Sequence, residues 1–130
     1  MSLRHFEVGA ELGRGAVGTV FSGVHRPSGI PVAIKTLTAR TRAAEISLNR
    51  ELAAMARLNH VHVLYLYDHG VAGPDDPFEE GTAWLALEYA SSGGLQSWQP
   101  ASWSAARRRI LSVLDGLALA HARGLVHRDL

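Results

Sequence analysis

The sequence predicts an α+β fold, with an antiparallel sheet that carries one main helix and is followed by the first helices of a second, α-rich part. Two patterns support this. A glycine run over residues 13–20 continues into β-branched and aromatic residues that alternate with period two, which is typical of strands. Apolar residues also recur at helical spacing within 48–58 and 110–121. With 130 residues, 47% of them hydrophobic, the chain can bury the core of one domain.

The glycine run, Gly-Arg-Gly-Ala-Val-Gly-Thr-Val, is predicted to join two strands. The pattern of residues 19–24, directly after the run, predicts a strand. In a dinucleotide-binding fold the glycines instead follow a strand and begin a helix. Gly13, Gly15 and Gly18 lack a Cβ atom, so the backbone N–H groups at these positions can come close to a phosphate. The run therefore predicts a phosphate-binding turn between strands.

Lys35 is the only lysine among 13 Lys and Arg residues, and it stands in Val32-Ala33-Ile34-Lys35. An ammonium is a compact point charge with three donors, whereas a guanidinium is a wide planar fork. Two phosphate oxygens and one carboxylate could share an ammonium. We therefore expect Lys35 to contact phosphates.

The main helix is predicted within 43–58, where apolar residues at 48, 52, 55 and 58 follow helical spacing. The acidic, turn-rich residues 70–81 are expected to be a solvated connection. A second helix is expected over 104–122, with a serine cap before its first turn and Gly124 as its stop. Its apolar face comprises Ile110, Val113, Leu114, Leu117 and His121.

The order of these features resembles the protein kinase family. The features are the glycine run, Val-Ala-Ile-Lys, the helix glutamate, residues 84–95, which resemble the fifth strand running into the hinge, and the final His127-Arg128-Asp129-Leu130. They follow one another at spacings that fit the family. The resemblance covers the whole chain and about the first half of a kinase domain. It implies an N-terminal lobe over 1–87, a hinge over 88–94 and the beginning of the C-terminal lobe over 95–130. One departure is Val61, where the family usually has proline.

The resemblance implies an ATP site. Lys35 would hold the α- and β-phosphates and pair with Glu51, which matches the family's helix glutamate better than Glu45 does. Leu87 would guard the back of the pocket, and the backbone of Glu88 and Ala90 would bind the adenine. The residues implied to bind the nucleotide are Leu12, Gly13, Gly15, Gly18, Val20, Ala33, Lys35, Leu87, Glu88 and Ala90.

The last residues resemble the start of the family's catalytic loop. Asp129 occupies the position of the catalytic base, Arg128 the position that meets a phosphorylated activation loop, and His127 opens the motif. The family's metal-binding asparagine and Asp-Phe-Gly come after this motif. We therefore expect Mg²⁺ only in a complete domain, no metal ligand here, and no phosphotransfer by these 130 residues alone.

The resemblance implies ATP and a protein substrate as partners of the complete domain. The abundance of Ala and Arg with almost no Lys suggests a GC-rich bacterial genome. The tight, insert-free N-terminal lobe resembles bacterial serine/threonine kinases. An alternative is a kinase remnant that binds nucleotide or docks on a partner without catalysis.

Other classes of function are less favoured by the residues. His60 and His62 have no third ligand at a usual zinc spacing, and the chain has no cysteine. The run 107–109 of three arginines lies at the start of an amphipathic helix in a chain of net charge +1, so we interpret it as a solvated helix face and expect no nucleic acid partner. Because no apolar run could span a membrane and no signal pattern is present, a cytoplasmic location is expected.

Overall fold

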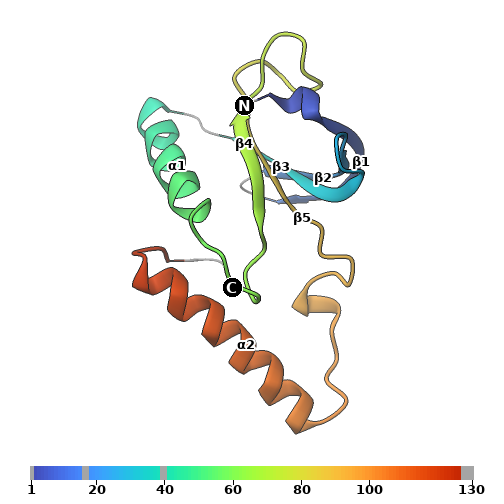
Figure 1. The fold of residues 1–130 in the computed structure, drawn as a ribbon, viewed down its shortest axis with the longest axis vertical. Helices are drawn as coiled ribbons and strands as arrows, with labels where there is room; N and C mark the ends of the chain where they lie inside the picture. Colours follow the sequence, from blue (N-terminus) through green and yellow to red (C-terminus); the bar gives the residue numbers. More distant parts are fainter. Residues whose placement is uncertain (1, 16–17, 39–40, 127–130) are drawn as a thin grey trace.

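The computed structural model describes residues 2–15, 18–38 and 41–126, with the backbone alone at 44, 47 and 51 (Figure 1). Five strands form one antiparallel sheet in the order β1-β2-β3-β5-β4. The predicted α+β class is confirmed. The strands are β1 (Phe6–Gly15), β2 (Gly18–His25), β3 (Ile30–Leu37), β4 (Leu66–Val71) and β5 (Ala83–Glu88), and the helices are η1 (Leu3–His5), α1 (Arg42–Met55), η2 (Leu95–Ser97) and α2 (Trp103–Ala122).

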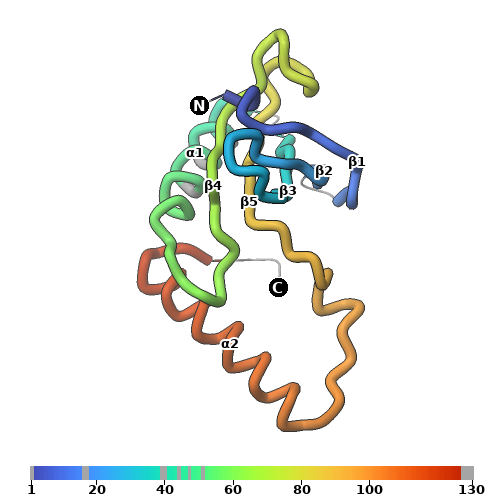
Figure 2. The backbone as a smooth tube through the Cα atoms, turned by 45° about the vertical axis from the view of Figure 1, so that its right-hand side comes forward, coloured from blue at the N-terminus to red at the C-terminus, as the bar shows by residue number. Residues whose placement is uncertain are grey.

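One face of the sheet is covered by α1. Figures 1 and 2 both show this helix alongside β4. Leu52 of α1 is buried with Leu66 of β4 and Leu85 of β5, and Leu48 and Met55 pack against the same cluster. The helical spacing seen in the sequence therefore corresponds to the side of α1 that contacts the sheet.

The opposite face holds a second core. Val32 and Ile34 alternate along β3 and are buried on this face together with Trp84 of β5. The indole ring of Trp84 meets the ring of Phe6 edge-on, with 5.9 Å between the ring centroids. Since Val32 and Ile34 occupy this face, the alternation of the strand assigns Ala33 and Lys35 to the face that carries α1.

The connection between β4 and β5 is mostly exposed, as expected, but it is not solvated throughout. Residues 70 and 71 belong to β4, Ala72 is buried, and the Phe78 ring packs on Phe21 with 5.1 Å between centroids. The segment is rich in acidic residues, but its apolar residues Ala72 and Phe78 contribute to the core on the face opposite α1.

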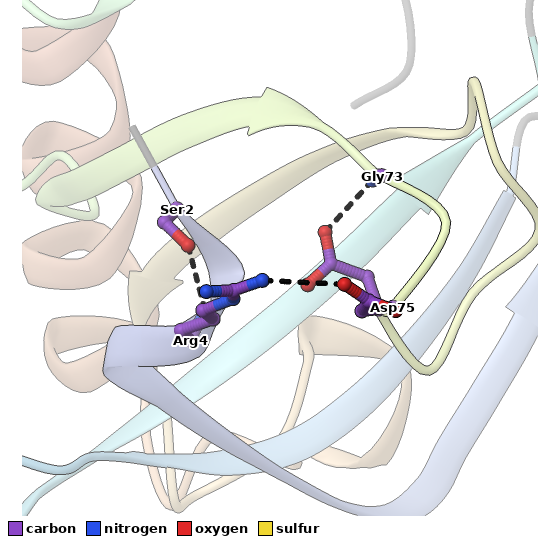
Figure 3. Close-up of polar contacts among 5 residues, drawn as sticks. Ser2, Arg4, Gly73 and Asp75 are labelled. Atoms are coloured by element: carbon purple, nitrogen blue, oxygen red, sulfur yellow. Dashed lines mark hydrogen bonds and ion pairs between the residues drawn. The ribbon is translucent and has the colours of Figure 1, made fainter.

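The same connection is tied to the N-terminal segment (Figure 3). The Arg4 guanidinium lies 3.3 Å from the carboxylate of Asp75, while the N–H of Gly73 donates to the Asp76 carboxylate at 2.8 Å. Both partners of the Arg4–Asp75 pair are largely exposed, so this ion pair adds little stability.

The second helix, α2, has the predicted ends. Ser102 is its N-cap, with a hydroxyl oxygen that accepts from the N–H of Ala105 at 3.1 Å. At the other end Gly124 has φ 77°, and the N–H of Leu125 donates to the carbonyl of Ala120 at 2.9 Å. This six-to-one hydrogen bond around a left-handed glycine is the Schellman arrangement.

The α2 helix packs against the segment between α1 and β4 rather than against the sheet. Gly116 is the buried residue of the helix, and a Cβ at this position would lie 2.9 Å from the carbonyl oxygen of His62. The Asp115 carboxylate lies 3.2 Å from Nε2 of His60 across the same contact. On the predicted apolar face, Ile110 and Leu114 are 50% and 53% exposed.

Candidate functional site

The sheet register brings the glycine run and Lys35 into one row. Gly13 of β1 pairs with Val20 of β2, Val20 pairs with Lys35 of β3, and Lys35 pairs with Leu85 of β5. Residues directly opposite in antiparallel strands share a face of the sheet. Val20 and Lys35 therefore lie side by side on the face that carries α1, and Gly13 of β1 lies in the same row.

Two further predicted residues adjoin this row. Ala33 lies two residues before Lys35 on the same face and pairs with Leu87 across β3 and β5. Leu87 is partly buried against the cluster beneath α1, whereas Leu12 is 49% exposed at the bulge of β1. Ala33 and Leu87 thus form an apolar floor on the face of the sheet to which Lys35 belongs.

Lys35 is half-buried and makes no ion pair with any carboxylate whose side chain the structure describes. Its expected partner Glu51 lies in α1, three residues after Leu48 and four before Met55, which both pack on the sheet. The side chain of Glu51 is outside the described part, so the ion pair stays a prediction. A half-buried ammonium without a described counter-charge is suited to bind an anion.

Glycine is required for different reasons at the three positions of the run. A Cβ at Gly18 would lie 1.8 Å from the carbonyl oxygen of Thr36, so the close approach of β2 to β3 requires glycine there. At Gly13 a Cβ would meet no atom within 4 Å, and at Gly15 the nearest is 4.0 Å away. Packing of the described residues thus explains Gly18 alone, and it leaves room for a ligand over Gly13 and Gly15.

The cation within the glycine run is already neutralised. The Arg14 Nε donates to a carboxylate oxygen of Glu11 at 3.0 Å, and Nη2 donates to the other oxygen at 3.3 Å. This fork lowers the pKa of Glu11 and raises that of Arg14. Lys35 is therefore the cation of this row that is left for a ligand among the described residues.

Beyond Leu87, the backbone N–H of Glu88 is hydrogen-bonded, whereas that of Ala90 is not bonded within the described residues. The N–H of Glu88 donates to the carbonyl of Tyr65 at 2.8 Å, and the Glu88 carboxylate accepts from the N–H of Tyr65 at 3.2 Å. The carbonyl of Ala90 accepts from Gly93 at 3.3 Å, while the N–H of Ala90 has no acceptor among the described residues.

A comparison of the sequence with protein families decides the assignment. The family described as "Protein kinase domain" matches residues 6–130, nearly the whole chain. The chain belongs to the protein kinase family. The antiparallel sheet with its helix is accordingly the N-terminal lobe of the kinase fold, and α2 belongs to the beginning of the C-terminal lobe.

Individual kinases align over almost all of this chain. It is 35% identical to "CBL-interacting protein kinase 4" of rice, 33% to "Serine/threonine-protein kinase Pkn1" of Myxococcus xanthus and 29% to "Interferon-induced, double-stranded RNA-activated protein kinase" of rat. The alignments cover 98%, 96% and 98% of the chain but only 29%, 18% and 28% of those proteins. The chain therefore spans about a quarter of the length of such relatives.

The predicted catalytic-loop residues His127, Arg128 and Asp129 lie outside the described residues. Among the described ones, no three His, Asp or Glu side chains gather into a group that could hold a metal ion. In the same part of the chain no helix is long and apolar enough to cross a membrane.

Sequence reasoning missed a second group of polar contacts, along α2. Arg109, which we expected to be a solvated residue of the helix, has its guanidinium 5.6 Å from the centre of the Trp98 ring. Cavities of about 390 and 280 Å³ flank Arg109, and neither is lined by Lys35 or the glycines. No local sequence pattern marks a contact between a loop tryptophan and a helix arginine eleven positions later.

Proposed function

We propose that this chain forms the ATP-binding part of a serine/threonine protein kinase. The observation that carries the proposal is the row Gly13–Val20–Lys35, in which the only lysine of the chain is half-buried without a described counter-charge. Membership of the kinase family supports it, as do relatives named as serine/threonine kinases. The complete protein would transfer the γ-phosphoryl group of ATP to protein hydroxyls.

Phosphoryl transfer asks mainly for positioning and for stabilisation of charge on the phosphate oxygens. Lys35 would bind the α- and β-phosphates, and Glu51 would hold its ammonium in place. Backbone N–H groups at Gly13 and Gly15 would cover the phosphates, because a Cβ is absent where the ligand must approach. Magnesium would supply additional charge neutralisation when bound, but the described residues contain no site for it.

The adenine would lie between the apolar floor and the end of β5. The unpaired N–H of Ala90 would donate to the adenine ring. Glu88 would contact the ring through its backbone carbonyl, since the N–H of Glu88 is bonded to Tyr65. Leu12, Val20, Ala33 and Leu87 would contact the faces of the ring. Such a site combines apolar contacts with a few placed polar groups, as cofactor sites generally do.

The final motif would provide the chemistry in the complete protein. Asp129 would accept the proton of the substrate hydroxyl, and Arg128 would contact a phosphorylated activation loop. His127 would help to position the loop. These roles rest on the match of His127-Arg128-Asp129 to the kinase motif.

Labelling by an ATP analogue tests the nucleotide site. An acyl-phosphate derivative of ATP transfers its acyl group to a lysine amine beside the bound phosphates, and only Lys35 and the N-terminal amine can react here. We expect modification of Lys35, measured by peptide mass spectrometry, to fall when unmodified ATP is in excess. Modification of the N-terminal amine serves as the internal control and should not change.

The Lys35→Arg variant separates charge from reactivity. It keeps a cation but has no acylatable amine, so label should remain only at the N-terminus. If ATP leaves the labelling of Lys35 unaltered, the proposed nucleotide site is wrong.

A further inference from the structure

A cavity of about 390 Å³ lies between the segment around η2 and the first half of α2. We call it the Trp98 cavity. The half-buried residues Trp98, Ala105 and Ser112 line its inner part, and the exposed side chains of Gln99, Arg108 and Arg109 line its mouth, together with Ala101. Its volume is within the range of small-ligand sites, and its mouth is cationic.

The two guanidinium groups of the Trp98 cavity have no carboxylate partner among the described residues. The guanidinium of Arg109 lies over the ring of Trp98, 5.6 Å from its centre. A cation–π contact of this kind leaves the N–H groups of the guanidinium available as donors. Arg109 is thus held near Trp98 but is still able to bind an anion.

Two acidic side chains of this region make other contacts. Glu88 lines the neighbouring cavity together with Arg109, but its carboxylate accepts the N–H of Tyr65 at 3.2 Å. Asp115, on the same helix, lies 3.2 Å from the ring of His60. Neither carboxylate forms an ion pair with Arg108 or Arg109, so both guanidinium groups are left for an anionic ligand.

We propose that the Trp98 cavity binds the phosphate of a phosphorylated serine or threonine in a partner polypeptide. Two guanidinium groups match the charge of a phosphate dianion and its bidentate geometry. The apolar surface of Trp98 and Ala101 would contact residues that flank the phosphate. Two cations in a chain of net charge +1 suit one phosphate better than a nucleic acid backbone. The site is separate from Lys35 and does not depend on nucleotide binding.

Arg107 provides a matched control, because it belongs to the same arginine run but does not line the cavity. Binding of a fluorescein-labelled peptide with one phosphoserine between alanine and glycine residues is measured by anisotropy. Arg108→Gln and Arg109→Gln should each weaken binding about tenfold, as expected for one charge-assisted hydrogen bond. Arg107→Gln, which removes the same charge, should weaken it less than about twofold.

The unphosphorylated peptide should not bind, and inorganic phosphate should compete only weakly because it lacks the flanking contacts. The proposal is overturned if the phosphopeptide shows no saturable binding, if the three arginine variants lose affinity equally, or if inorganic phosphate competes as well as the peptide. Tighter binding of a single-stranded RNA of the same length would also overturn it. Thermal unfolding of Arg107→Gln and Arg108→Gln should match the parent chain, because both side chains are exposed. Arg109→Gln should lose only the contact with Trp98 and unfold slightly earlier.

Discussion

At the residue scale, the glycines of the run differ in what a side chain would meet. The structure predicts that Gly18→Ala lowers the free energy of unfolding by about 2 kcal/mol or more, because its Cβ would lie 1.8 Å from the Thr36 carbonyl oxygen. Gly13→Ala meets no atom within 4 Å and should change stability by less than about 1 kcal/mol. Urea unfolding of both variants measures the difference.

Gly13→Ala, which should hardly change stability, should weaken nucleotide binding. Gly13→Ala should reduce the protection of Lys35 by ATP in the labelling experiment, since the added methyl group occupies space that we assign to the phosphates. Equal stability loss in both variants would show that Gly13 is needed for folding and not for a ligand.

A second residue-scale prediction concerns the pair Glu11 and Arg14. The hydrogen bonds from Arg14 lower the pKa of Glu11 below its ordinary value of 4.5. Because the folded-state pKa is depressed, the stabilisation by this pair is present at neutral pH and is lost as the pH falls through that folded-state value. In Arg14→Gln the pKa should rise toward 4.5, as measured by carbon NMR of the side-chain carboxyl. An unchanged pKa in this variant would contradict the hydrogen bonds.

At the element scale, α2 depends on its first cap. Ser102→Ala removes the acceptor for the N–H of Ala105 and should cost about 1 kcal/mol of stability. Ser104→Ala is the matched control, because the exposed side chain of this serine in the first turn makes no hydrogen bond among the described residues. Urea unfolding should show a loss for Ser102→Ala and little change for Ser104→Ala. Equal effects would mean that the cap does not stabilise the helix.

Elements were predictable where local chemistry determines them. The serine cap and Gly124 delimit α2 within one residue of the expected start, and the alternation after Gly18 identified β2. The β4–β5 connection was only partly predicted, because Ala72 is buried in the core that contains Phe6, and Phe78 is partly buried beside Phe21, both far away in the sequence. A solvated composition does not reveal such tertiary burial.

At the scale of the whole molecule, one part of the candidate site was predictable from the sequence and another part was not. The order of motifs led to the kinase family and hence to Lys35, but the row that joins Gly13, Val20 and Lys35 needed the register of three strands. The contacts His60–Asp115 and Trp98–Arg109 join segments that have no shared periodicity. Both contacts involve α2, whose docking no pattern within the helix could specify.

The docking of α2 onto the 60–64 segment rests on the close approach at Gly116. Gly116→Val would place a branched side chain against the His62 carbonyl, which is 2.9 Å from the Cβ position, and against Val63. We expect a loss of about 2 kcal/mol and faster amide hydrogen exchange in α2 and in residues 60–64. Ala118→Val, on the exposed side of the same helix, carries only the propensity cost of valine, roughly 0.6 kcal/mol. If both variants exchange at the same rates, the contact at Gly116 does not hold α2 to the N-terminal lobe.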